Sequence, residues 1–172
     1  MKKYLLSGSI LLVAGLVFWS CIKEPDFSTT PYITFQSIRK IVATDAFSQG
    51  KKDSVIVTIF FQDGDGDLGM TQKDFQDDKS PLKGLNNYEV KAFRSKNGKF
   101  SEITLSPPLG GFFPPLRTDG KTGPIEGNLD YSFDFLQSFT AKRDTLKFEI
   151  RIRDRKLNYS NAVQTEMIIL NE

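Results

Sequence analysis

Three aspartates at alternating positions are the part of this chain best suited to chemistry. Asp63, Asp65 and Asp67 are separated by Gly64 and Gly66, which let the backbone curl tightly. In this spacing the carboxylates can turn their oxygens toward one centre, where they would repel one another without a cation. Calcium takes roughly six to eight oxygen ligands, so the run predicts a calcium site. The alternative is a solvated turn, because Asp-Gly pairs are also common in ordinary turns.

The spacing of the aspartates resembles the start of the calcium loops in EF-hand and dockerin proteins. In that resemblance Asp63, Asp65 and Asp67 take the first three ligand positions and Asp74 takes the twelfth. Leu68 stands where those families have glycine, Asp74 is shorter than their usual glutamate, and a strand is expected before the run instead of a helix. The resemblance therefore implies a strand-end calcium loop with these four aspartates as ligands, and not a complete EF-hand.

The chain contains few of the residue types that most enzymes use for catalysis. The chain has no histidine and a single cysteine, Cys21. These counts exclude Ser-His-Asp and Cys-His catalysis, zinc or copper sites built on histidine, and a disulfide framework. A hydrolase with paired carboxylates is the one enzymatic alternative, and only the aspartate run supports it. We therefore expect a protein that is not an enzyme and whose oxygen ligands suit hard cations.

The cysteine follows a segment with the pattern of a secretory signal. Lys2 and Lys3 precede an apolar stretch over residues 5–19, and Ser20 stands directly before Cys21. A basic start, an apolar middle and a small residue before the cleavage point are typical of signal peptides. We expect residues 1–20 to be removed, so that the mature chain begins at Cys21. The alternatives are an uncleaved transmembrane anchor, which wants about twenty apolar residues, and a buried structural cysteine.

This cleavage point resembles the lipobox of bacterial lipoproteins, with Phe18 at the position where that family usually has leucine. The resemblance implies a covalent lipid on Cys21: a diacylglycerol on the sulfur and a further acyl chain, such as palmitate, on the new amino group. Each buried methylene contributes about 0.8 kcal/mol, so three chains would hold the protein stably at a membrane. Relaxed lipoboxes of this kind are typical of Bacteroidota lipoproteins, which implies an outer-membrane location.

Residues 21–31 have the composition of a tether. They are mostly polar, and Pro25 and Pro31 interrupt regular structure. Lys23 and Glu24, followed by Asp26, loosely resemble the Bacteroidota signal for export to the cell surface. The alternative is an ordinary charged linker, so the periplasmic face and the cell-surface face of the membrane both stay open.

Removal of the signal peptide also changes the charge. The chain has 23 basic and 21 acidic side chains, and Lys2 and Lys3 leave with the signal, so the mature protein is balanced at 21 of each. A balanced chain gives no reason to expect a nucleic-acid partner. The 152 residues that remain of the 172 are enough for one domain with a sizeable core, which we expect over residues 32–172.

From residue 32 onward the apolar residues alternate with a period of two, as they do in strands. Segment 54–62 is apolar on both faces and should lie centrally in its sheet, whereas segment 146–152 alternates apolar and charged residues like a strand with one solvated face. We predict an all-β protein, a single antiparallel immunoglobulin-like β-sandwich of about seven strands, with a short helical turn around 71–78. The predicted strands are 32–38, 54–62, 87–94, 100–105, 129–135, 146–152 and 163–169.

Two segments resemble small envelope lipoproteins of the Bacteroidota that have immunoglobulin-like folds. The first runs from Phe61 through the aspartates to Gly69, and the second runs from Ile152 through Asp154 and Asn158 to residue 165. This resemblance covers most of the mature chain and implies no assigned reaction. It implies that Asp154 and Asn158 lie in a loop near one end of the sandwich, and leaves open whether the aspartate run shares that end.

A second unusual segment, residues 106–116, combines four prolines with Phe112 and Phe113. Proline denies hydrogen-bond donors to a sheet and stiffens the chain. If the two rings are exposed on this stiff loop, they form a partner-binding patch. If they are buried, they plug one end of the core, which stabilises the fold by about 1.5 to 3 kcal/mol per ring.

Two functional hypotheses follow. The first is a noncatalytic outer-membrane lipoprotein that serves as an accessory or binding subunit of an envelope protein complex for transport, assembly or secretion. The alternative is a cell-surface glycan-binding module whose aromatic rings stack on sugars. The single tryptophan, Trp19, leaves with the signal and weakens this alternative. The rings available for stacking are Tyr88, Phe93, Phe112, Phe113 and Tyr131.

Overall fold

The structure is a computed structural model that describes residues 24–172. The predicted signal peptide over 1–20, the predicted lipidation of Cys21 and the first residues of the predicted tether lie outside the described residues. From residue 24 to residue 31 the chain forms no strand or helix. No helix of the described part is long and apolar enough to cross a membrane.

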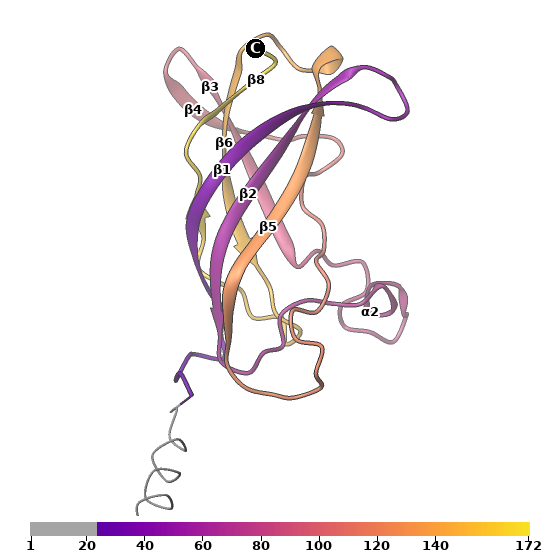
Figure 1. The fold of residues 1–172 in the computed structure, drawn as a ribbon, viewed down its shortest axis with the longest axis vertical. Coiled ribbons are helices and arrows are strands. Elements are labelled where there is room, and N and C mark those ends of the chain that lie inside the picture. Colours follow the sequence, from indigo (N-terminus) through magenta and orange to yellow (C-terminus); the bar gives the residue numbers. More distant parts are fainter. Residues whose placement is uncertain (1–23) are drawn as a thin grey trace, which may run out of the picture.

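One sheet has three long antiparallel strands, β1 (Tyr32–Thr44), β2 (Lys51–Asp63) and β5 (Ile125–Leu136), in the order β1-β2-β5 (Figure 1). The central position predicted for segment 54–62 is confirmed, because β2 pairs along its whole length with both neighbours. Its inward face is fully buried. Ile56 and Phe60 on the outward face are only half-buried, so the expected coverage of both faces is wrong for that side.

The facing sheet contains β3 (Tyr88–Lys96), β4 (Lys99–Ile103), β6 (Asp144–Ile152), β7 (Val163–Gln164) and β8 (Ile168–Leu170). Its order is β4-β3-β6, and both β7 and β8 pair with the other edge of β6. The single strand predicted over 163–169 is therefore two short strands. Thr165 divides them, because its side-chain oxygen accepts the Phe148 amide at 3.0 Å in place of a strand carbonyl.

The two sheets bury one continuous core, which confirms the predicted all-β antiparallel sandwich. The described residues hold eight strands where about seven were expected. The helical turn predicted near residue 75 is also present, as the short helix α2 (Gln72–Gln76). A single 3-10 turn, η1 (Gln137–Phe139), follows β5. The fully buried large side chains of the strands come from both sheets: Ile33, Val55, Val57, Ile59, Tyr88, Leu146, Phe148, Ile150, Ile152 and Leu170.

The two ends of the sandwich differ. The N-terminal segment, the end of β2 and the start of β5 lie together at one end (Figure 1). The β1–β2 turn and η1 lie at the other end, since Lys52 near the start of β2 pairs with Leu136 at the end of β5. Because β2 ends at Asp63, the aspartate run begins at the same end as the N-terminal segment.

Candidate metal centre

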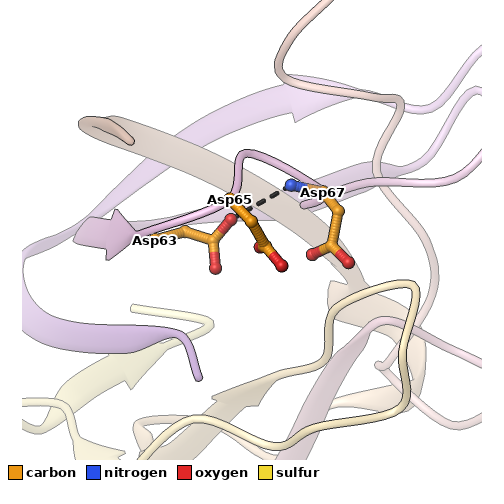
Figure 2. Close-up of side chains that lie close together, drawn as sticks. All are labelled: Asp63, Asp65 and Asp67. Carbon is orange, nitrogen blue, oxygen red and sulfur yellow. Dashed lines mark hydrogen bonds between the residues drawn. The ribbon is translucent and has the colours of Figure 1, made fainter. Parts of the chain in front are cut away.

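The three aspartates of the run converge in the structure. Asp63 is the last residue of β2, and the chain then turns sharply so that Asp65 and Asp67 point in the same direction (Figure 2). Each residue offers a carboxylate oxygen, and these three oxygens lie within 4.8 Å of one another. Among the described residues this is the one group of three acidic side chains placed closely enough to share a metal ion.

Asp63 sets the shape of the loop. This residue has no exposure to solvent, and its Oδ2 accepts the backbone amides of Gly66 at 2.8 Å and Asp67 at 3.1 Å. Gly66 has a φ of +73°, a conformation that suits glycine and closes the turn. The side chain of the first aspartate therefore folds the loop that carries the other two.

The opposite oxygens of the three carboxylates have no partner. Oδ1 of Asp63, of Asp65 and of Asp67 are each buried and accept no hydrogen bond from the described residues. A buried polar atom without a partner costs roughly 1 to 3 kcal/mol, and more when it is charged. Three such atoms in one place form a set of ligands that a single cation could satisfy.

Other buried aspartates of the same fold are fully satisfied. Asp53, at the far end of β2, is equally buried, yet its two oxygens accept Gln137 Nε2 at 2.8 Å and the Asn171 amide at 2.6 Å. Both oxygens of Asp154 are satisfied by Asn158, at 2.7 and 2.8 Å. The unpaired oxygens are thus a property of the Asp63 loop and not of buried aspartates in this protein.

The same crowding perturbs the acidity of the cluster. Burial, reinforced by the negative charges of Asp65 and Asp67, raises the pKa of Asp63 to about 6. Burial and the charges of Asp154 and Asp65 raise the pKa of Asp67 to about 6 as well. A bound cation would favour the ionised forms and reverse both shifts.

One basic side chain approaches the cluster from solvent. Lys156 forms an ion pair with Oδ2 of Asp65, and its Nζ lies 3.9 Å from Oδ2 of Asp67. This lysine is mostly exposed and contacts the oxygens opposite to the unpaired ones. It neutralises part of the charge and leaves the inner oxygens unpaired.

Asp74 does not join the three other predicted ligands. It closes the capping box of α2, where its Oδ2 accepts the Thr71 amide and hydroxyl, both at 2.9 Å, and it pairs with Arg155 at 3.3 Å. The hydrogen bonds from Thr71 lower the pKa of Asp74. The EF-hand-like ligand order is wrong at its twelfth position, because a Thr-x-x-Asp sequence favours a helix cap.

Segments distant in sequence enclose the aspartate loop. Leu68 is bridged to Asp154, so the loop over 154–158 shares this end of the sandwich. The Gly123 amide donates to the carbonyl of Asp65 at 3.2 Å, and the Leu116 amide donates to the carbonyl of Leu68 at 3.1 Å. The sequence carries no local signal for these contacts or for Lys156.

A hollow of about 250 Å³ lies beside two of the three aspartates. Asp65 and Asp67 line it together with the basic side chains of Arg117, Lys121 and Arg155. The hollow therefore reaches Asp65 and Asp67 but not the buried Asp63.

The predicted aromatic patch is largely internal. Phe113 is 4% exposed, and Asn87 holds its backbone with two hydrogen bonds, at 2.9 Å to the amide and 3.2 Å to the carbonyl. Phe112 is half-buried and stacks on Phe75 with ring centres 5.1 Å apart. The proposed partner-binding role of Phe113 is therefore wrong, and the ring instead plugs the core.

The other three rings proposed for glycan stacking are Tyr88, Tyr131 and Phe93, and none of them is strongly exposed. Tyr88 is fully buried and stacks on Tyr131 with ring centres 4.0 Å apart, which joins β3 to β5 across the core. Phe93 is half-buried, and the ammonium of Lys147 lies 5.7 Å from its ring centre. No member of the proposed aromatic set is among the strongly exposed side chains of the described residues.

Comparisons with protein-family models, with curated proteins and with solved structures found no match to this chain. The predicted likeness to Bacteroidota lipoproteins therefore stays a prediction.

Proposed function

We propose that the protein is a noncatalytic, lipid-anchored lipoprotein of the outer membrane whose β-sandwich binds a calcium ion at Asp63, Asp65 and Asp67. The observation that supports the ion site best is the set of three buried carboxylate oxygens without partners. One cation among them would satisfy all three at once.

Calcium fits this site better than other common metals. The ligands are hard carboxylate oxygens, and the chain has no histidine to favour zinc or copper. Calcium accepts irregular geometry and a mixture of carboxylate, carbonyl and water ligands at about 2.3 to 2.6 Å, whereas magnesium demands a nearly ideal octahedron. Three acidic residues from one loop beside an open hollow suit the more tolerant ion.

The proposed lipid anchor and the ion site lie close together along the chain. Cys21 lies seven residues before Ser28, whose carbonyl touches the aspartate loop. An extended chain covers roughly 3.3 Å per residue, so about 23 Å separates the proposed lipid from the ion site at most. The ion site would then lie near the membrane surface, on its periplasmic or cell-surface face.

The role in an envelope complex is supported by the opposite end of the molecule. Phe47 in the β1–β2 turn is 98% exposed and Phe139 in η1 is 87% exposed. Aromatic side chains are enriched at protein–protein interfaces relative to the rest of the surface. We therefore favour an accessory or binding subunit over a glycan-binding module, because none of the five rings proposed for sugar stacking is exposed: two are buried and three are half-buried.

Titration calorimetry with calcium chloride tests the ion site. We expect one ion per chain, and no binding by a variant with Asp65→Asn and Asp67→Asn. The matched control is Asp130→Asn with Asp134→Asn, which removes two exposed carboxylates from the outer face of β5. An intact protein that binds no calcium at millimolar concentrations would refute the site.

Two further measurements test the anchor and the partner. Intact-mass analysis of native protein should show a chain that begins at a triacylated Cys21, and a Cys21→Ala variant should leave the membrane fraction.

Affinity purification from detergent-solubilised outer membrane tests the partner and should recover a stoichiometric protein. Binding on a glycan array without such a protein partner would favour the alternative function.

A further inference from the structure

The N-terminal segment contacts the backbone of the aspartate loop. Gly64 lies between Asp63 and Asp65, and its amide donates to the carbonyl of Ser28 at 2.8 Å. A β-carbon on Gly64 would lie 2.3 Å from the carbonyl oxygen of Phe27, so there is no room for a side chain at this contact. The segment that leads to Cys21 is thus packed directly on the peptide that joins two of the proposed calcium ligands.

This contact is the outermost backbone tie between the described part of the segment and the sandwich. Further along the chain, Pro31 is buried, and Ile33 is held by two hydrogen bonds of 2.8 Å to the Asn161 side chain. Residues 24–26 are exposed, and Phe27 is half-buried. Release of the Gly64 contact would therefore free the segment up to about Pro31.

We propose that calcium binding locks this N-terminal segment onto the aspartate loop and so limits how far the sandwich can stand from its anchor. The proposal rests on the calcium site proposed above. Without the ion, the three carboxylates repel one another and the loop that presents the Gly64 amide loosens. With the ion, they are drawn together and the docking surface for residues 27 and 28 is held in place.

The consequence at the membrane is a change in the length of free tether. With the segment docked at Ser28, Cys21 lies seven positions before the docked residue, a reach of about 23 Å in an extended chain. With the segment released up to Pro31, Cys21 lies ten positions before the first held residue, a reach of about 33 Å. Calcium would therefore shorten the reach of the sandwich from the membrane by about 10 Å.

The coupling must be reciprocal. If calcium strengthens docking of the segment, then docking strengthens calcium binding by the same factor, typically about 5-fold to 150-fold. A change in the segment that touches no ligand must therefore weaken calcium binding. This requirement separates a true lock from a segment that merely lies beside the site.

Amide hydrogen exchange on the mature lipoprotein in detergent micelles tests the lock. We expect calcium to slow exchange of the Gly64 amide, which donates to the Ser28 carbonyl, by about tenfold or more. The variant with Asp65→Asn and Asp67→Asn should show no such slowing. If calorimetry shows calcium binding while exchange of the Gly64 amide stays unchanged, the lock is refuted and the calcium site stands. If no calcium binds, both proposals fail.

Two substitutions test the reciprocity. Gly64→Ala places a methyl group against the Phe27 carbonyl, and Phe27→Ala removes the half-buried ring without changing the loop itself. We expect each to weaken calcium binding by about tenfold and to speed exchange of the amide at position 64. Gly127→Ala, where the methyl group meets only an ordinary contact of 3.5 Å, is the matched control and should change neither. Unchanged calcium affinity in Phe27→Ala, with faster exchange, would refute the coupling.

Discussion

At the residue scale, the basic side chain nearest to the aspartates is that of Lys156. Lys156 pairs with Asp65 on the solvent side of the cluster and competes electrostatically with any cation there. The hydrogen bond to Asp65 raises the pKa of this lysine, so its ammonium stays charged at neutral pH. The protein therefore carries a built-in competitor for its own proposed metal site.

We predict that Lys156→Gln strengthens calcium binding by about threefold to tenfold, because one positive charge near the ion is removed. Calorimetry at low ionic strength measures the change, which should shrink as salt is added. Lys96→Gln, in the exposed β3–β4 hairpin, is the control and should have no effect. Weaker calcium binding in Lys156→Gln would show that the lysine supports the site.

A pH dependence follows from the acidity of Asp67. Folding raises the pKa of this carboxyl from its ordinary value of 3.8 to about 6, so the folded state holds the proton more tightly than the unfolded state. The stability that this proton contributes is fully present below about pH 4 and is lost as the pH rises through 6. When a chelator removes calcium, Asp67→Asn should have a higher free energy of unfolding than the wild type at pH 7.5, by on the order of 2 kcal/mol. This difference in stability should close toward pH 4.

Urea unfolding at a series of pH values measures that gap, and saturating calcium should abolish or invert it at pH 7.5. Calcium keeps the carboxylate ionised in the folded state, which removes the reason for the shift. A gap that does not change between pH 4 and pH 7.5 would contradict the raised pKa.

At the scale of single elements, the loop over 106–116 depends on one ring. Phe113 enters the core while Asn87 satisfies its backbone amide and carbonyl. The backbone carbonyl of Phe113 also accepts the Met70 amide at 3.1 Å, so this residue holds the chain that leaves the aspartate loop. Stability and the shape of the ion site are therefore linked through this loop.

We predict that Phe113→Ala lowers the free energy of unfolding by about 3 to 5 kcal/mol, the usual cost of deleting a buried phenylalanine ring. Denaturant unfolding measures it. Phe139→Ala makes the same chemical change at an exposed position and should cost less than about 0.5 kcal/mol. Equal effects of the two substitutions would mean that Phe113 is not part of the core.

The elements that the sequence predicted well are those with regular alternation. The segments within β2 and β6 follow a strict period of two, and both are strands in the structure. The extension of β1 to Thr44 was missed, because residues 39–44 do not alternate: the neighbours Ile41 and Val42 are both apolar and both exposed. The division of the last predicted strand was also missed, since it depends on a side-chain hydrogen bond between Thr165 and Phe148.

The residues of the candidate site were likewise predicted only where the signal is local in the sequence. Convergence of Asp63, Asp65 and Asp67 is a local property of their spacing, and it was predicted. The placement of Asp74 failed because the Thr71 cap competes for its carboxylate. Lys156 and Ser28 come to the loop from distant parts of the chain, through the fold alone, and no local pattern indicates them.

At the scale of the whole molecule, one aromatic stack joins the two sheets. Tyr88 of β3 and Tyr131 of β5 lie nearly parallel, at 11°, with ring centres 4.0 Å apart. The core around them is continuous from one sheet to the other. The two sheets should therefore unfold together in one cooperative transition.

We predict a coupling free energy of about 0.5 to 1.5 kcal/mol between Tyr88→Leu and Tyr131→Leu in a double-mutant cycle, since each ring interacts with the other beyond simple burial. Denaturant unfolding of the four proteins measures it. The control cycle pairs Tyr88→Leu with Phe139→Leu and should show no coupling. Two separate unfolding transitions in the wild type would contradict the single core.

The direction in which β1 leaves the N-terminal segment has a mechanical consequence. β1 starts at the end nearest the proposed anchor and runs the length of the sandwich beside β2, to which it is paired antiparallel from Tyr32 to Thr44 (Figure 1). Hydrogen bonds of an antiparallel pair stand perpendicular to the strands. A pull between the membrane and a load at the far end would strain all of these bonds in shear at once, instead of opening them one by one like a zipper.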